Sequence, residues 1–136
     1  MNNKAVIGAV VGSLALLVII FLIVRFIKKY KRKGYYKERW QDLQKFCANK
    51  ETWPLAIITA DKLLDEALKK QGMKGKSTGE RLVTAQRELT DNDGVWFAHN
   101  LAKKLVEETA LRLRQTDVKK SLLGFLQALK DLGVME

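Results

Sequence analysis

The sequence predicts an all-α protein, with one N-terminal transmembrane helix followed by a compact four- or five-helix antiparallel bundle. Two observations lead to this prediction. Residues 5–24 form twenty consecutive positions without a charged side chain, which is the length that a helix needs to cross a bilayer. After residue 34, apolar residues recur at spacings of three and four, and no segment alternates convincingly as a strand does. The predicted domains are a transmembrane anchor (1–27), a basic juxtamembrane collar (28–39) and a cytoplasmic helical bundle (40–136).

The apolar run has the length and the flanks of an uncleaved anchor. At about 1.5 Å per residue, twenty helical residues reach about 30 Å, the thickness of the hydrocarbon core. A cleaved secretory signal has an apolar stretch of about 7 to 15 residues with small residues before its cleavage site, whereas this run ends in bulky residues up to Ile27. Gly8 and Gly12 form a G-x-x-x-G pair, a spacing that lets membrane helices dimerise. Small residues are frequent in such spans, so we do not assign the pair this role.

Basic residues concentrate on the C-terminal side of the run. Lys4 is the only charged side chain before it, whereas seven of the twelve residues 28–39 are Lys or Arg and one is Glu. The membrane collar consists of Lys28, Lys29, Lys31, Arg32 and Lys33. By the positive-inside rule, we expect the N-terminus outside and the C-terminal domain in the cytoplasm. The aromatic residues that follow fit either the membrane interface or the first helix of the bundle; they are Tyr30, Tyr35, Tyr36 and Trp40.

The formal net charge of +10 suggests a nucleic-acid-binding protein, but its distribution argues against one. Residues 40–136 carry sixteen bases and fourteen acids, so the bundle is close to neutral. The basicity belongs mainly to the collar, where it sets the topology and attracts anionic lipid. The expected partners are therefore the lipid bilayer and a protein partner or a second copy of the chain, and not nucleic acid.

Two helices are predicted between Gly34, which we expect to loosen the chain after the collar, and the loop near Gly72. The first covers about residues 35–49 and has Cys47 on its apolar stripe. Thr52 and Pro54 open the second, because proline in the first turn of a helix loses no hydrogen bond. Cys47 is the only cysteine, which excludes an intramolecular disulfide, and a buried small thiol is its expected role.

Three further helices complete the predicted bundle. Ser77 and Glu80 match a capping box for a short third helix that reaches about residue 89. The acidic break at 90–94 opens a fourth, which extends to Leu111 or beyond. Thr116 is expected to cap the fifth, which Gly133 ends. The apolar stripe of the fifth consists of Val118, Leu122, Phe125, Leu129 and Leu132.

Three groups of residues could carry chemistry. Gly75-Lys76-Ser77-Thr78 resembles the end of a phosphate-binding P-loop, but the required first glycine is Lys70 here and no strand precedes it. Asp61 and Asp65 lie one helical turn apart, where they could hold a metal or pair with nearby Lys or Arg, for example Lys62 or Lys69. We favour such pairing, or simple solvation of the two carboxylates, and predict no metal and no cofactor.

The densest aromatic cluster of the chain is Trp96-Phe97-Ala98-His99. A single histidine beside aromatic residues is more often a hydrogen-bonded core or rim residue than a catalyst. We expect His99 to anchor a contact between helices.

Four motifs of this chain occur in the order found in one protein family. They are Ala56-Ile-Ile-Thr-Ala-Asp-Lys-Leu-Leu-Asp-Glu-Ala-Leu68, Lys74-Gly75 with Gly79-Glu80-Arg81-Leu82, Gly94-Val95-Trp96-Phe97-Ala98-His99, and Ala128-Leu-Lys-Asp-Leu-Gly133. Across about residues 38–134 the chain resembles uncharacterised single-pass membrane proteins of candidate-phyla-radiation bacteria (Patescibacteria). The resemblance implies a protein of the bacterial cytoplasmic (inner) membrane with a helical domain similar to HEPN domains, many of which are ribonucleases.

The resemblance also implies where catalytic residues would stand. In the family, the Trp-x-Ala-His segment continues into Lys-Leu-Arg-Asn-Arg-x-Ala-His-Glu, and HEPN ribonuclease activity depends on the arginine and histidine of this motif. Here Ala102 stands at the arginine position, Lys103 at the asparagine position and Glu107 at the histidine position. Alanine cannot bind phosphate, and a carboxylate repels it. His99 matches a family position outside the motif, so the resemblance implies no catalytic residue in this chain.

The expected function is a noncatalytic, membrane-anchored helical interaction module at the cytoplasmic face of the membrane. The candidate polar or interaction positions are Asp61, Asp65, Trp96, His99, Lys103 and Glu107. One alternative is an RNA-binding or ribonuclease-type protein, in which Lys103 and Lys104 contact phosphate and Glu107, His99 or the two aspartates perform the chemistry. The other is a sensor of anionic lipid that acts through the collar.

Overall fold

The computed structural model describes residues 3–108 and 110–136, and in these residues all regular secondary structure is helical, with no β-strand. The elements are α1 (Asn3–Gln44), the 3-10 helices η1 (Lys45–Ala48) and η2 (Lys50–Thr52), α2 (Trp53–Lys70), α3 (Thr78–Thr84), α4 (Asn92–Glu107) and α5 (Gln115–Asp131). The chain divides into two units, Met1–Gly34 and Tyr35–Glu136. The predicted all-α class, with one long apolar helix followed by a helical bundle, is confirmed.

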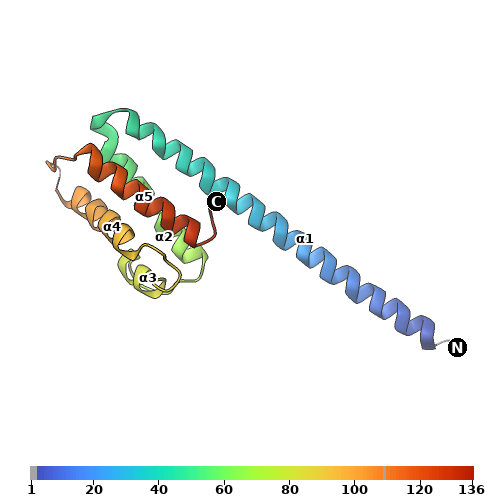
Figure 1. Ribbon diagram of the computed structural model, residues 1–136. Coiled ribbons are helices and arrows are strands. Elements are labelled where there is room, and N and C mark those ends of the chain that lie inside the picture. Colours follow the sequence, from blue (N-terminus) through green and yellow to red (C-terminus); the bar gives the residue numbers. More distant parts are fainter. Residues whose placement is uncertain (1–2, 109) are drawn as a thin grey trace. The chain divides into compact units, whose positions relative to one another are not determined.

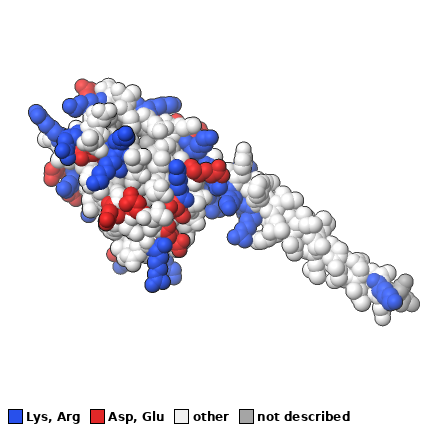
Figure 2. Space-filling view, in the orientation of Figure 1, with Lys and Arg blue, Asp and Glu red and all other residues white. Residues whose placement is uncertain are grey.

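The N-terminal unit consists of one helix with exposed apolar side chains. Val6 through Phe26 contribute a nearly unbroken series of side chains that are about half exposed or more. Figure 2 shows a stretch of this helix without charged side chains, with blue basic side chains at both of its ends. Among the described residues, this is the one helix long and apolar enough to cross a membrane.

The predicted break at Gly34 is wrong, because α1 continues through it to Gln44. A single glycine inside a helix costs only about 1 kcal/mol relative to alanine, and Gly34 does not have a positive φ. The first helix of the bundle is therefore the C-terminal part of α1. It ends before the predicted residue 49, and Cys47 lies in η1, where it is half-buried rather than fully buried.

The structure resolves the roles of the aromatic residues beyond the collar. Tyr36 and Trp40 are 1% and 6% exposed and join Leu43 in the core of the second unit. Tyr30, by contrast, is 75% exposed. The boundary between the two units, after Gly34, thus lies inside the segment 28–39.

The starts of α2, α3 and α4 agree with the predicted signals. Proline stands in the first turn of α2. Ser77 Oγ accepts the Glu80 backbone N–H at 3.1 Å, while the Glu80 carboxylate accepts the N–H of Lys76. Asp91 caps α4 by accepting the N–H of Gly94. These side chains satisfy amide groups that lack an intrahelical acceptor.

Three predicted helix boundaries are wrong. α3 ends at Thr84 rather than near residue 89. The residues after it form turns with short-range hydrogen bonds, such as the one from the Glu88 N–H to the Ala85 carbonyl. α4 ends at Glu107 and does not reach Leu111. Thr116 does not cap α5, which begins at Gln115 with Arg114 in the capping position. The predicted end of α5 near Gly133 is confirmed, with φ of +75° at that glycine.

The core of the bundle lies between α2, α4 and α5, which contact one another (Figure 1). Of the predicted α5 stripe, four residues are buried, whereas Leu122 is only partly so. α4 and α5 approach each other closely at Gly94 and Gly124, where a Cβ added to Gly124 would lie 2.5 Å from the Gly94 carbonyl oxygen. Here the two backbones touch without side chains between them.

Candidate functional site

A cluster of polar side chains joins α2 to α3 and α4. His99 of α4 is 6% exposed, and its Nδ1 lies 2.7 Å from Oδ1 of Asp61 on α2. The histidine therefore connects two helices, as expected from the sequence. The partner of Asp61 is this imidazole and not a nearby lysine.

Asp65, one turn further along α2, binds the buried Arg81 of α3. Its Oδ1 accepts Nε of Arg81 at 2.8 Å and lies 2.7 Å from Nη2. Nη1 of the same guanidinium donates to the Gly75 carbonyl at 2.7 Å, and Lys69 approaches Asp65 Oδ2 at 3.2 Å. The fork of the arginine thus fastens the loop before α3 and the helix itself to α2.

The environment of Asp65 favours its charged form. Burial alone would raise the pKa of this carboxyl, but hydrogen bonds from Arg81, Thr78 and Lys69 outweigh burial and hold the pKa below its ordinary value of 3.8. The predicted pairing with Lys69 is present, whereas Arg81 was not singled out as a partner from the sequence. The sequence feature that could have pointed to Arg81 as a partner is its position directly after the capping residue Glu80, in a short helix with few apolar residues.

Trp96 completes this cluster from the same helix as His99. The two rings meet edge to face, with centroids 5.9 Å apart. A Cβ on Gly79 of α3 would lie 3.6 Å from the indole ring and 3.8 Å from His99 Nε2, so α3 covers both rings. Within the described part of the chain, no group of three His, Cys, Asp or Glu side chains is placed to hold a metal ion.

The positions at which the sequence resemblance would place catalytic residues lie elsewhere on α4. Ala102 is 3% exposed and belongs to the core. Lys103 and Glu107 line a small hollow of about 300 Å³ on the protein surface, together with Asn100 and Lys104. The structure therefore joins Asp61, Asp65, Trp96 and His99 in one cluster and leaves Lys103 and Glu107 outside it.

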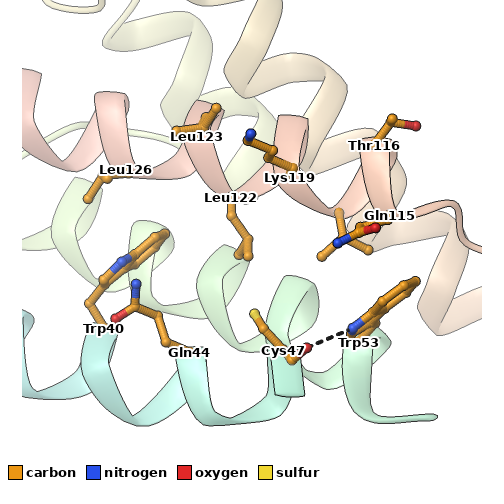
Figure 3. A pocket seen from close by; sticks show the side chains of 11 residues that line it. Trp40, Gln44, Cys47, Trp53, Gln115, Thr116, Lys119, Leu122, Leu123 and Leu126 are labelled. Atoms are coloured by element: carbon orange, nitrogen blue, oxygen red, sulfur yellow. Dashed lines mark hydrogen bonds between the residues drawn. The ribbon is translucent and has the colours of Figure 1, made fainter. Parts of the chain in front are cut away.

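A larger cavity, which we call the α1–α5 groove, opens between the C-terminal part of α1, η1, the start of α2 and α5. Its volume is about 690 Å³. Figure 3 shows the indole of Trp40 reaching toward Leu126, and the thiol of Cys47 facing Leu122. The lining residues are Trp40, Gln44, Cys47, Trp53, Gln115, Thr116, Val118, Lys119, Leu122, Leu123 and Leu126.

The wall of the groove beside Cys47 is fixed by a hydrogen bond. Nε1 of Trp53 donates to the Cys47 carbonyl at 2.9 Å, a contact drawn in Figure 3. This bond satisfies the one polar group of the indole, so that its ring presents apolar surface. Burial raises the pKa of the Cys47 thiol, which keeps it protonated and poorly nucleophilic.

The chemistry of the groove is that of an apolar surface with a polar rim. Its lining includes no aspartate or glutamate, and Lys119 is its only charged residue. Leu123 on the α5 side is 56% exposed. The sequence analysis did not identify this groove; the available signal was Leu123 and Leu126, which are apolar residues of α5 beyond its predicted core stripe.

No protein-family model, curated protein or solved structure matches the chain. The resemblance to single-pass proteins with HEPN-like domains therefore stays a prediction from the sequence motifs.

Proposed function

We propose that this chain is a noncatalytic, single-pass membrane protein whose cytoplasmic bundle binds a partner protein through the α1–α5 groove. The N-terminal helix is long and apolar enough for a span, and the excess of bases after it supports a cytoplasmic bundle. The observation that carries the binding role is the groove itself.

The groove has the properties of a protein-docking surface. It has a volume of about 690 Å³, and most of its lining residues are apolar. Tryptophan is enriched among residues that dominate binding energy, and Trp40 and Trp53 both line this groove. An apolar channel between helices suits the apolar face of an amphipathic helix.

The charge of the rim defines the partner further. Lys119 stands on the rim without an acidic residue in the lining. An amphipathic helix with a carboxylate beside its apolar face would match both the floor and the rim. We therefore assign the groove to a helix of this kind in a partner protein.

The polar cluster supports a structural and not a catalytic role. Asp61 is bonded to His99, and Asp65 to Arg81, so both carboxylates are used in holding α2 against its neighbours. At the motif positions, Ala102 offers a buried methyl group and Glu107 an exposed carboxylate. Neither supplies a cation or a neutral-pH proton carrier for phosphate chemistry.

Site-specific photocrosslinking of the full chain in native membranes tests the proposal. A photoreactive side chain is placed at Leu123 on the groove, or at Val83 on α3 as the matched control, since both residues are 56% exposed. We expect one protein adduct from position 123 and none from position 83. Lys119→Glu should reduce the yield of this adduct at least about fivefold, since one rim contact worth about 1 kcal/mol corresponds to that factor, whereas Lys70→Glu on the exposed end of α2 should not.

Equal adducts from both positions, or an adduct that is insensitive to Lys119→Glu, would contradict docking in the groove. An adduct with twice the mass of the chain would assign the groove to a second copy instead. A ribonuclease-sensitive adduct would favour the RNA-binding alternative.

A further inference from the structure

The collar forms a dense basic surface directly after the apolar part of α1. Lys28, Lys29, Lys31 and Arg32 are exposed, and no acid occurs before Glu38. All four lie inside the continuous helix Asn3–Gln44, so their spacing is that of a helix. Figure 2 shows blue basic side chains gathered at the end of the uncharged stretch of the helix.

Helix geometry distributes the four bases over one sector of the helix surface. At about 100° per residue, positions 28, 29, 31 and 32 cover an arc of about 160°. Along the axis they begin about 6 Å beyond Val24 and end about 12 Å beyond it. The collar is thus a broad sector about one turn deep.

This depth coincides with the polar layer of a bilayer. A bilayer is about 40–45 Å thick with its headgroup regions, and its hydrocarbon core is about 30 Å thick. The polar layer on each side is therefore about 5–8 Å thick. Lys28 and Lys29 fall within that layer when the hydrocarbon core ends near Val24. Lys31 and Arg32 lie one turn beyond, and their long side chains can extend back toward the phosphates.

We propose that the collar is a binding site for anionic phospholipid, which it concentrates around the anchor. Ammonium and guanidinium groups bind the phosphates of lipids with a net negative headgroup, and such segments attract anionic lipid near a membrane surface. On the face of the bundle shown in Figure 2, by contrast, bases and acids are intermixed, and residues 40–136 carry sixteen bases and fourteen acids. This inference rests on the proposed membrane span.

Lipid selectivity of the full chain in nanodiscs measures this binding. The discs contain phosphatidylcholine and a trace of spin-labelled phosphatidylcholine or spin-labelled phosphatidylglycerol. Lipid that contacts a transmembrane helix gives a motionally restricted component in the electron spin resonance spectrum. The ratio of the two restricted fractions reports the preference for the anionic lipid.

We expect a ratio of about 3 at low salt, and about 1 in 1 M salt, where the Debye length falls to about 3 Å. The variant Lys28→Gln/Lys29→Gln/Lys31→Gln/Arg32→Gln should also give about 1. A control that removes the same charge from the bundle, Lys50→Gln/Lys62→Gln/Lys70→Gln/Lys74→Gln, should keep the ratio of the unmodified chain.

The possible failures are distinguishable. A restricted phosphatidylcholine component with no preference for phosphatidylglycerol would overturn the lipid site and leave the anchor intact. A preference that survives in the collar variant would also overturn it. No restricted component with either lipid would overturn the membrane span, and with it the lipid site.

Discussion

The two faces of α5 differ in how completely the rest of the bundle covers them. The face toward α4 and α2 is so closely packed that Gly124 has no room for a Cβ beside the Gly94 carbonyl. The face toward Cys47 and Trp40 leaves a groove of about 690 Å³, with Leu123 at its rim 56% exposed. One helix therefore has a side that holds the fold together and a side that remains available for binding.

The polar residues follow the same division. Away from the groove, where α2 meets α3, Asp65 is bonded to Arg81. On the groove side, the polar groups lie on the rim around an apolar floor. Substitutions on the closed side should change stability, whereas substitutions in the groove should change binding with little effect on stability.

The largest effect is expected where α4 meets α5. Gly124→Ala places a Cβ 2.5 Å from the carbonyl oxygen of Gly94 and 2.8 Å from its carbon, and since both are backbone atoms the helices must move apart. We expect a loss of about 3 kcal/mol in the free energy of unfolding. Urea unfolding of the full chain in nanodiscs, followed by circular dichroism at 222 nm, measures it.

Gly34→Ala is the control for this substitution. A Cβ at Gly34 meets nothing within 4 Å, and alanine favours a helix over glycine by about 1 kcal/mol. The variant should be at least as stable as the unmodified chain. Equal losses for both substitutions would mean that the closeness of α4 and α5 is not what limits position 124.

The next largest effect is expected at the buried guanidinium. Arg81→Met keeps most of the apolar stem but removes the guanidinium donors from the Asp65 carboxylate and the Gly75 carbonyl. We expect a loss of about 2–3 kcal/mol. Lys69→Met removes a donor from the same carboxylate, but this lysine side chain is 60% exposed, so its loss should cost less than about 0.5 kcal/mol.

The pH dependence of unfolding separates the charge of this pair from its packing. The pKa of Asp65 is lower in the folded chain than its ordinary value of 3.8, so the unfolded state binds the proton more tightly. The contribution of the pair is complete above pH 3.8 and is lost as the pH falls through the lower, folded-state pKa. The free energy of unfolding should therefore fall less at acid pH in the Arg81→Met variant than in the unmodified chain. An equal fall in both would contradict this assignment.

The smallest effect is expected at Ser121, on the closed face of α5. This residue is 0% exposed, and its Oγ has no hydrogen-bond partner within the described residues. A buried hydroxyl without a partner is destabilising. Ser121→Ala should thus change the free energy of unfolding by no more than about 1 kcal/mol, in the direction of greater stability, and a loss above that size would reveal a partner for the hydroxyl.

The sequence was sufficient to predict most of the closed face of α5, but not the face that borders the groove. Helical spacing identified Val118, Phe125 and Leu129 as core residues because burial on a helix follows its 3.6-residue period. The cap at Ser77 was also predictable, since it depends on residues three apart. The boundaries of α1, α3 and α4 were not, because short-range turns and tertiary contacts decide where a helix ends.

The candidate site shows the same limit. Asp61 and Asp65 were singled out because they share a helix face, but their partners lie 38 and 16 residues away along the chain. Helical spacing cannot choose between a local lysine and a distant histidine or arginine. The groove depends on the separation between η1 and α5, which no pattern within either segment encodes.

The three tryptophans are divided between the two sides of the bundle. Trp40 and Trp53 border the groove, whereas Trp96 lies against His99 in the closed polar cluster. The bundle therefore contains its own fluorescent reporters of both regions. In a Trp96→Phe variant, the remaining emission would come from the groove alone, and a change in its wavelength would signal the arrival of a ligand without any attached dye.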